Sequence, residues 1–333
     1  MNKVTIEDIS RQTGLSRGTV SRALNDRPDI SQQTKQKVLE ACRRLRYVPS
    51  HAARALATGR RCAVAVLVDD LRSTFAAGFL RGVLARARAQ RYAVILCELG
   101  ADTPGALEQL RALAAERVDG VLLAAPLPPD AAQAVVEALD ERPIVAVSAL
   151  EGIACDVLTP DAAEAGRLAA NHIVRPGVAD VLYVHEDGAG SPQTLAGFQE
   201  VCRRQRLDPR AVTVVVSRSG GAGAQWLDPL RGRLAGVRAI AASSDFLAME
   251  IAFLCAQAGR AVGRDVGLIG QGNEAVGAVL TPTLTTIDYC GEEIGRRALD
   301  IALQRVSGVR QDAPQRTLVP PVLVARDSTR LPG

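Results

Sequence analysis

A chain of 333 residues, 47% hydrophobic and 23% charged, is long enough for two or three folded domains and is not disordered by composition. No stretch of 18 apolar residues and no export-signal pattern occurs, which excludes a helical membrane span and predicts a cytoplasmic protein. Seven cysteines form no CxxC pair and the three histidines are isolated, so we expect reduced core cysteines, no metal site and no cofactor.

Positive charge is concentrated at the start of the chain. Residues 1–60 carry twelve lysines and arginines and five acidic residues, a formal charge of +7, which leaves −3 for residues 61–333. A local basic excess attracts anionic polymers. The first sixth of the chain is therefore the expected site of contact with such a polymer.

Three short helices are predicted in this basic segment, each behind a polar N-cap residue. A short turn between the first two is the pattern of a helix-turn-helix unit. The first helix is expected over 6–12 after the cap Thr5, with Asp8 at the capping-box position and Gly14 ending it; the second follows Ser16; the third follows Ser31 and runs to about Arg46.

The second helix has one apolar side and one side of arginine, glycine and hydroxyl residues. In a helix-turn-helix this element enters the DNA major groove, so we predict that Arg17 and Arg22 read bases and that Gly18 allows close backbone approach. A second set of polar residues would contact the DNA backbone, although each could equally be an ordinary cap or surface group. These are Thr5, Ser16, Thr19, Ser21, Asn25, Ser31 and Thr34.

The segment SHAARALATG (50–59) is alanine-rich and spans less than three helical turns. An isolated helix of this length is unstable in water, so it is expected to fold only against a partner. It is either a plain linker or a hinge helix that inserts Leu56 into the minor groove, with Arg54 holding the DNA backbone.

These features, in this order and spacing, resemble the lactose/galactose repressor (LacI/GalR) family of bacterial transcription regulators. The resemblance implies a homodimeric, sequence-specific repressor that binds a pseudopalindromic DNA operator, with Arg17 and Gly18 setting the operator sequence and Leu56 intercalating. The matching segments are VTIEDISRQTGLSRGTVSRALN (4–25), RYVPS (46–50), ARAL (53–56), RVDGVLL (117–123), SDFLAM (244–249), LTTID (284–288) and VARDST (324–329).

After residue 60 the sequence alternates apolar runs with amphipathic helical stretches. Near-continuous β-branched runs separated by helices predict parallel strands covered on both faces, and their number predicts two doubly wound α/β sheets of five or six strands with a cleft between them. The resemblance implies a fold like that of periplasmic sugar-binding proteins and, because no leucine-heptad helix follows STRLPG, a dimer. The implied division is a headpiece over 1–49, a hinge over 50–60 and an effector domain over 61–333, with one lobe at 61–158 plus 288–319 and the other at 159–287 plus 320–333.

A small-molecule effector, which in this family can be sugar-derived, is expected in the cleft, because ligands of parallel sheets bind beyond the carboxyl ends of the strands. Each candidate residue there could also be an ordinary polar loop residue. The candidates are Ser73, Phe75, Ser148, Ser244, Asp245, Gln271 and Asn273. Many sugar- and purine-binding members have an arginine where this chain has Thr194 and an aspartate where it has Gly272. An altered effector pocket is therefore expected, and either a smaller or less hydroxylated metabolite or no effector at all fits this change.

Two other classes of function remain as alternatives. The segment GQGNEA (270–275) fits the glycine pattern of a dinucleotide-binding turn, with Asp288 at a suitable distance for a ribose contact, so an NAD-dependent enzyme is the first. A solute-binding protein without catalysis is the second. No nucleophile elbow, metal-ligand cluster or paired-carboxylate motif supports hydrolytic chemistry, and an enzyme is not expected.

Overall fold

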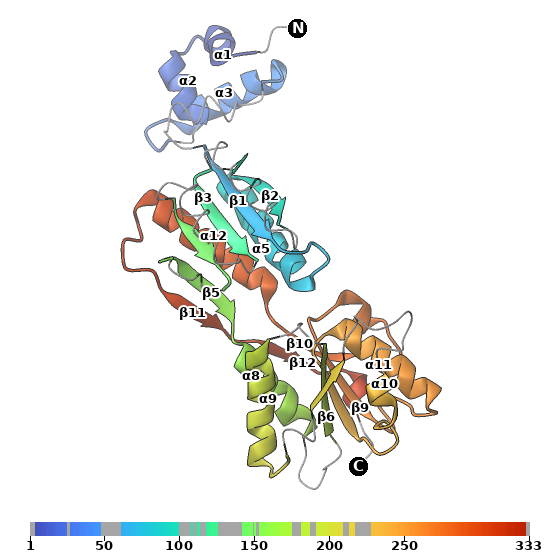
Figure 1. Ribbon diagram of the computed structural model, residues 1–333. Helices are drawn as coiled ribbons and strands as arrows, with labels where there is room; N and C mark the ends of the chain where they lie inside the picture. Colours follow the sequence, from blue (N-terminus) through green and yellow to red (C-terminus); the bar gives the residue numbers. More distant parts are fainter. Residues whose placement is uncertain are drawn as a thin grey trace. The chain divides into compact units, whose positions relative to one another are not determined.

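The computed structural model, drawn in Figure 1, divides into two units, residues 1–62 and 63–333. The structure describes residues 4–24, 27–47, 61–99, 108, 112–113, 118–125, 142–148, 150, 153–174, 181–186, 191–208, 213–216 and 228–330.

The described residues of the first unit form a headpiece of three helices around one small core. Its buried residues come from all three helices and include Ile9, Val20 and Val38. The helices are α1 (Ile6–Thr13), α2 (Arg17–Leu24) and α3 (Gln32–Arg44). The three predicted helices are therefore present. The third ends at Arg44, because Arg46 takes a left-handed conformation with φ of 51°.

Local hydrogen bonds explain where the first helix begins and ends. The Asp8 carboxylate accepts hydrogen bonds from the Thr5 amide and the Thr5 hydroxyl, each at 2.9 Å. Gly14 follows the helix with φ of 69°, a conformation that costs glycine little. The predicted capping residue, capping-box residue and terminating glycine of α1 all have the expected roles.

The second unit contains two six-stranded sheets, with strand orders β11-β5-β4-β3-β1-β2 and β12-β10-β9-β8-β6-β7. All pairings are parallel except that of β10 with β12. We call the part built on the first sheet lobe 1 and the part built on the second lobe 2. The strands are β1 (Ala63–Val68), β2 (Ala93–Glu98), β3 (Gly120–Ala124), β4 (Ile144–Ala146), β5 (Asp156–Pro160), β6 (Val181–Glu186), β7 (Thr213–Val216), β8 (Ala239–Ala242), β9 (Gly267–Gln271), β10 (Thr285–Asp288), β11 (Arg316–Val319) and β12 (Val322–Val324).

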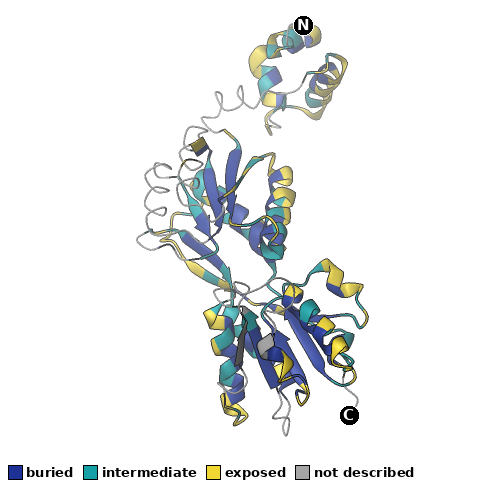
Figure 2. Cartoon of the chain, turned by 45° about the vertical axis from the view of Figure 1, so that its right-hand side comes forward, coloured by how far each residue is buried: buried dark blue, intermediate teal, exposed yellow. Residues whose placement is uncertain are grey.

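Helices flank both sheets, and the strands between them are largely buried (Figure 2). They are α5 (Thr74–Gln90), α8 (Ala162–Ile173), α9 (Pro192–Arg204), α10 (Asp228–Arg231), α11 (Asp245–Gln257) and α12 (Gly291–Ser307), with 3₁₀ helices η3 (Ala275–Ala278) and η4 (Asp327–Thr329). In β1, Val64, Val66 and Val68 pack toward α5 and α12, whereas Ala63 and Leu67 pack on the opposite face. This period of two with both faces buried is what a doubly wound sheet requires.

Helices α5 and α12 pack with their backbones in close contact. A Cβ atom at Gly295 would lie 2.0 Å from the carbonyl oxygen of Phe79, and one at Gly82 would lie 1.9 Å from that of Glu292. No side chain fits at either position without separating the helices. The two glycines therefore allow α5 and α12, which lie far apart in the chain, to pack closely against each other in lobe 1.

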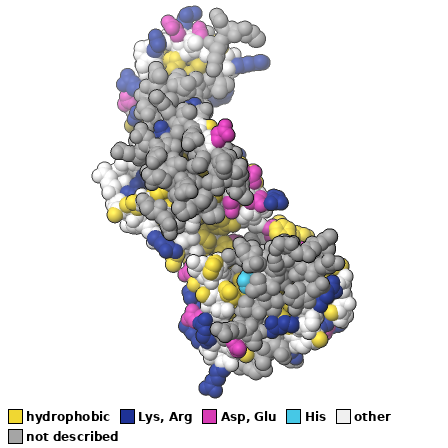
Figure 3. Space-filling view, in the orientation of Figure 1, with side chains coloured by type: hydrophobic (Ala, Val, Ile, Leu, Met, Phe, Trp, Pro, Cys, Tyr) yellow, Lys and Arg dark blue, Asp and Glu magenta, His cyan; other side chains and the backbone are white. Residues whose placement is uncertain are grey.

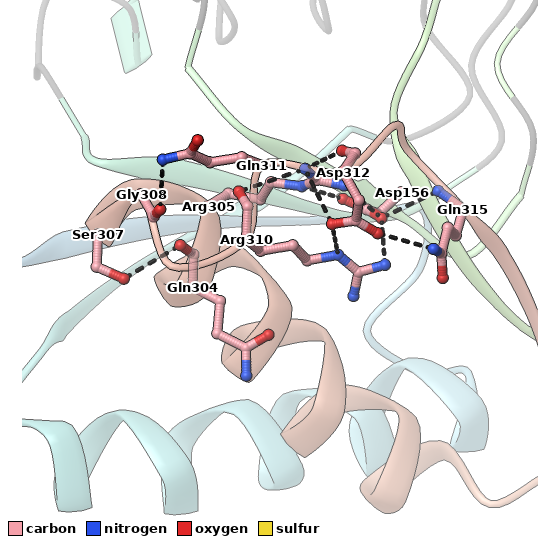
Figure 4. A network of polar contacts seen from close by, with 9 residues as sticks. All are labelled: Asp156, Gln304, Arg305, Ser307, Gly308, Arg310, Gln311, Asp312 and Gln315. Carbon is pink, nitrogen blue, oxygen red and sulfur yellow. Dashed lines mark hydrogen bonds and ion pairs between the residues drawn. The ribbon is translucent and has the colours of Figure 1, made fainter.

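A buried ion-pair network lies in lobe 1, at the end of the sheet where β5 and β11 begin (Figure 4). Asp156 is 3% exposed, and its carboxylate accepts hydrogen bonds from Arg305 at 2.8 and 3.2 Å and from the Gln315 amide at 3.1 Å. Arg310 lies 3.2 Å from the same carboxylate. Burial alone would raise the pKa of Asp156, but these partners outweigh it and lower the pKa.

The predicted fold class is confirmed, with differences in detail. Strands β5, β10, β11 and β12 were not predicted from apolar runs, because all four are short and the first three contain threonine, aspartate or arginine. The seven cysteines are free, with Cys42, Cys202 and Cys255 buried and the others half-buried. In the described part of the chain, no helix has the length and apolar character needed to cross a membrane.

Candidate functional site

The exposed face of α2 carries the predicted base-reading arginines. Arg17 and Arg22 are both exposed, while Val20 and Ala23 face the core. The Arg22 guanidinium donates a hydrogen bond to the Asp29 carboxylate at 3.1 Å. Both side chains are more than half exposed, so this pair is weak and the guanidinium can exchange Asp29 for another acceptor.

Nothing inside the headpiece requires glycine at position 18. A Cβ atom there would meet only Ser16 Oγ, at 3.8 Å, which is ordinary contact. Glycine costs a helix stability relative to alanine. No contact among the described residues of the headpiece therefore accounts for this glycine.

Several of the predicted backbone-contacting hydroxyls also act as helix caps. Ser16 Oγ accepts a hydrogen bond from the Thr19 amide at 3.1 Å, and Ser31 Oγ accepts one from the Thr34 amide at 3.2 Å. Thr5 caps α1, and Ser21 is half-buried on α2. Asn25, Arg54 and Leu56 lie outside the described residues.

In the second unit, two adjoining pockets open at the carboxyl ends of strands from both lobes. Hydrophobic side chains gather where the lobes meet (Figure 3). The first of the two pockets, which we call the acidic pocket, has a volume of about 510 Å³, and its wall includes Asp70, Arg72 and Glu274. The second, the apolar pocket, has a volume of about 350 Å³. Both volumes suit a small ligand.

The structure brings five of the seven candidate effector residues together. Ser73, Phe75, Ser244, Asp245 and Gln271 line the acidic pocket, and Phe75 and Gln271 also line the apolar one. The serines are N-caps: Ser73 accepts from the Ala76 amide in α5 and Ser244 from the Leu247 amide in α11. Each cap lies in the connection from a strand to the next helix, β1 to α5 for Ser73 and β8 to α11 for Ser244, which is why reasoning from strand ends located them.

Ser148 and Asn273 do not line either pocket. Ser148 is half-buried just after β4. Asn273 uses its side chain within lobe 2, donating to Asp288 at 2.9 Å and accepting from Arg326 at 2.8 Å. The structure therefore does not bring these two residues into either pocket, because being polar near a strand end does not determine where a side chain points; their role in effector binding stays a prediction.

The pocket walls also contain aromatic residues that were not predicted. Tyr289 lines both pockets, Tyr183 lines the apolar pocket and Phe246 the acidic pocket. Tyr289 follows β10, a strand that lacks an apolar run, and Tyr183 lies inside β6. The rarity of aromatic residues, 3% of the chain, is the sequence signal that could have identified them.

Gln271 links the two tyrosines. Its Oε1 accepts a hydrogen bond from the Tyr289 hydroxyl, and its Nε2 lies 3.5 Å from the Tyr183 hydroxyl oxygen, the outer limit of a hydrogen bond. Burial raises the pKa of both tyrosines, so both hydroxyls remain protonated at neutral pH. The cluster presents neutral hydrogen-bonding groups to the ligand.

The two positions at which the chain departs from the resembled family differ in exposure. Gly272 lines the acidic pocket and contributes no side chain to it. Thr194 in α9 is 1% exposed and its hydroxyl has no hydrogen-bond partner among the described residues. Neither position supplies a charged group to hold ligand hydroxyls.

The dinucleotide-binding alternative is wrong. A Cβ atom at Gly270 would lie 2.1 Å from Asp245 Oδ1, so this glycine makes room for a carboxylate. The segment after β9 forms the four-residue 3₁₀ helix η3, not the α-helix whose N-terminus would bind a pyrophosphate. The GQGNEA segment spans the end of β9 and the start of the connection that leads through η3 to the neighbouring strand β10.

Comparison with known proteins covers both units. Residues 5–50 match the lacI family of bacterial regulatory proteins, and residues 170–329 match the periplasmic binding protein-like domain. The HTH-type transcriptional regulator RegA of Clostridium saccharobutylicum is 25% identical over 332 residues, covering 98% of this chain and 99% of that protein. The HTH-type transcriptional repressor PurR of Vibrio parahaemolyticus is also 25% identical, over 98% of this chain and 99% of its own length.

A solved structure of the lac repressor dimer bound to operator and the anti-inducer ONPF has the same fold. It superposes with a TM-score of 0.77 at 22% identity, covering 98% of this chain and 99% of that one. The headpiece and the second unit each match a family model, and the relatives match both units over nearly the whole chain. The chain therefore combines a headpiece of the lacI family of bacterial regulatory proteins with a periplasmic binding protein-like domain.

Proposed function

We propose that this protein is a cytoplasmic repressor, not an enzyme, that binds a pseudopalindromic DNA operator as a homodimer under the control of a small molecule. The observation that carries the proposal is the exposed face of α2. It presents Arg17 and Arg22 beside Gly18, a glycine that the headpiece itself does not need. A helix that projects two arginines and allows close approach suits the major groove.

The arginines are assigned to base reading because a guanidinium binds guanine through two parallel hydrogen bonds. The hydroxyl residues on the headpiece are assigned to phosphate contacts, which position the protein without selecting sequence. The hinge assignment, Leu56 as the minor-groove wedge and Arg54 on the backbone, concerns residues outside the described part and follows from the resemblance alone.

Homodimer formation has support on the surface of lobe 2. Phe253 on α11 is 58% exposed, and Val279 after η3 is 79% exposed. Large apolar side chains as exposed as these are typical of surfaces that contact another protein. A two-fold dimer would cover them and would match the symmetry of a pseudopalindromic site.

We propose the domain division 1–49, 50–60 and 61–333. Within the last range the chain crosses between lobes near 158–160, 288 and 319–320, so a ligand that contacts both lobes can change their relative orientation. Control then follows from any difference in ligand affinity between the two orientations. Induction and corepression are both compatible with this arrangement.

Selection from a pool of randomised duplexes tests the proposed function. Full-length protein should enrich a site with two inverted half-sites, and the enriched duplex should compete much better than a shuffled one at fixed salt concentration. Enrichment of a single asymmetric half-site would contradict the homodimer. Absence of any enriched sequence would contradict a sequence-specific regulator.

A further inference from the structure

The acidic pocket has more negative than positive charge in its described wall. Its charged residues are Asp70, Arg72, Asp245 and Glu274. The Arg72 guanidinium donates hydrogen bonds to the Asp70 carboxylate, from Nε at 3.0 and 3.1 Å to its two oxygens and from Nη2 at 2.8 Å to one of them. This pair is internally neutral, which leaves two acidic groups without a cation in the wall.

These two acidic groups differ in how they are bound. Asp245 is 1% exposed, and its oxygens accept hydrogen bonds from the Thr286 hydroxyl at 2.6 Å and from the Glu274 amide at 2.7 Å. The Glu274 side chain is half-buried and has no hydrogen bond or ion pair among the described residues. Burial and the neighbouring Asp245 raise the pKa of Glu274, because both disfavour its ionised form.

The nearest compensating cation is already occupied. Burial raises the pKa of Asp245, and Arg326 offsets this only in part. The Arg326 guanidinium donates to the Leu284 carbonyl at 2.7 Å and to Asn273 Oδ1 at 2.8 Å. It does not line the pocket. A positive group from a ligand would therefore find carboxylate oxygens with free acceptor capacity at Glu274.

Aromatic rings are concentrated at the same place. The chain has only five phenylalanines, four tyrosines and one tryptophan, yet Phe75, Phe246, Tyr183 and Tyr289 line these two pockets. Two of the rings are backed by others: Phe75 lies 6.4 Å from Phe79 and Tyr183 lies 4.9 Å from Phe198, between ring centroids. Aromatic faces attract cations as well as apolar groups.

We propose that the ligand of these pockets is a small organic cation: an ammonium group on an aromatic or apolar body. The ammonium group lies beside Glu274 and Asp245, and the body packs on Phe75 and Tyr289. Gln271, whose Nε2 has only the long contact to Tyr183, can donate to a polar atom of that body. The same wall disfavours phosphorylated or carboxylated ligands. This inference rests on the proposed effector control, because it specifies the chemical class of the effector. Binding of such a cation can nevertheless be measured separately from its effect on DNA binding.

Three probes of matched shape separate charge from shape: 2-phenylethylamine, 2-phenylethanol and phenylacetate. Isothermal titration calorimetry with the full-length protein at neutral pH should show the amine binding at least about tenfold more tightly than the alcohol, with phenylacetate weakest. Glu274→Gln, which keeps the shape of the side chain, should remove most of that preference while leaving the affinity for the alcohol unchanged. Glu293→Gln on α12, outside both pockets, is the matched control and should change nothing.

Equal binding of the amine and the alcohol, or tighter binding of phenylacetate, would overturn the inference. So would an unaltered amine preference in Glu274→Gln, or failure of every member of a wider panel of aromatic and aliphatic amines to bind. The titration needs no DNA, so these outcomes leave the operator-selection result standing. Loss of selection with retained amine binding would overturn the regulator proposal and keep the pocket assignment.

Discussion

Glycine occupies two open positions in the headpiece for different reasons. A Cβ atom at Gly14 would have nothing within 4 Å, but the residue takes φ of 69°, whereas Gly18 has ordinary space and a helical backbone. The first glycine is required by backbone conformation and the second is not. Residue identity at position 14 follows from the local fold, whereas at position 18 no described contact requires it, and we propose that it follows from contact with DNA.

Gly18→Ala should therefore stabilise the headpiece and weaken operator binding. The gain is about 0.5–1 kcal/mol from the helix preference of alanine, and the loss follows from the added methyl group at the DNA surface. Hydrogen exchange of the α1–α3 amides in the full-length protein measures the first effect, and titration with the selected duplex measures the second. Gly14→Ala is the contrasting variant and should lower protection. A stabilised Gly18→Ala protein with unchanged operator affinity and sequence preference would remove the glycine from the interface.

At this scale the sequence predicted capping and exposure well, because both depend on neighbours within a few positions. It could not predict that Arg22 pairs with Asp29 seven residues away, or that Asn273 turns toward Asp288 and Arg326. Those contacts depend on the turn that brings the partners together. Five of the candidate effector residues lie together because a strand end fixes a location, whereas Ser148 and Asn273 lie outside both pockets because a strand end does not fix a side-chain direction. The binding role of all seven stays a prediction.

At the scale of elements, the network around Asp156 links β5, α12 and the segment leading to β11. Removing a buried carboxylate from between two arginines leaves uncompensated positive charge. Because the pKa of Asp156 is lowered in the folded protein, the carboxylate stabilises the fold above the ordinary aspartate value of 3.8. That contribution disappears as the pH falls through the lower folded-state pKa.

Asp156→Asn should destabilise the second unit by about 3 kcal/mol at neutral pH, measured by urea unfolding followed by circular dichroism. The difference from the unsubstituted protein should be constant above about pH 5 and shrink as the pH falls below 3.8. Glu293→Gln, which removes an exposed partner of Arg296 on the same helix, should have little effect at any pH. A constant difference down to about pH 2 would show that the charge of Asp156 is not what stabilises the lobe.

Strands were predicted correctly where burial on both faces makes the sequence apolar throughout. Strands such as β1, buried along its whole length, read as continuous apolar runs. Strands β5 and β10 were missed because Asp156, Thr285 and Thr286 are buried with their hydrogen bonds satisfied by distant residues. Polar residues satisfied in this way are indistinguishable, in sequence alone, from loop residues.

At the scale of the whole molecule, the second unit builds its pockets from residues far apart in the chain. Phe75 follows β1 in lobe 1 and Tyr289 follows β10 in lobe 2, yet both line both pockets. The sequence predicted two sheets and a cleft, but not which aromatic residues meet there. A regulator needs this property, because a ligand that contacts both lobes couples the pocket to their orientation.

The proposed sequence-specific repressor requires that α2 reads base sequence, and one measurement tests this directly. Arg22→Ala should lose more than about tenfold in affinity for the selected duplex while its affinity for a shuffled duplex hardly changes, both at the same salt concentration. Arg44→Ala, an exposed arginine at the end of α3, should weaken both duplexes to a similar small extent. Equal losses on both duplexes for Arg22→Ala would contradict the account.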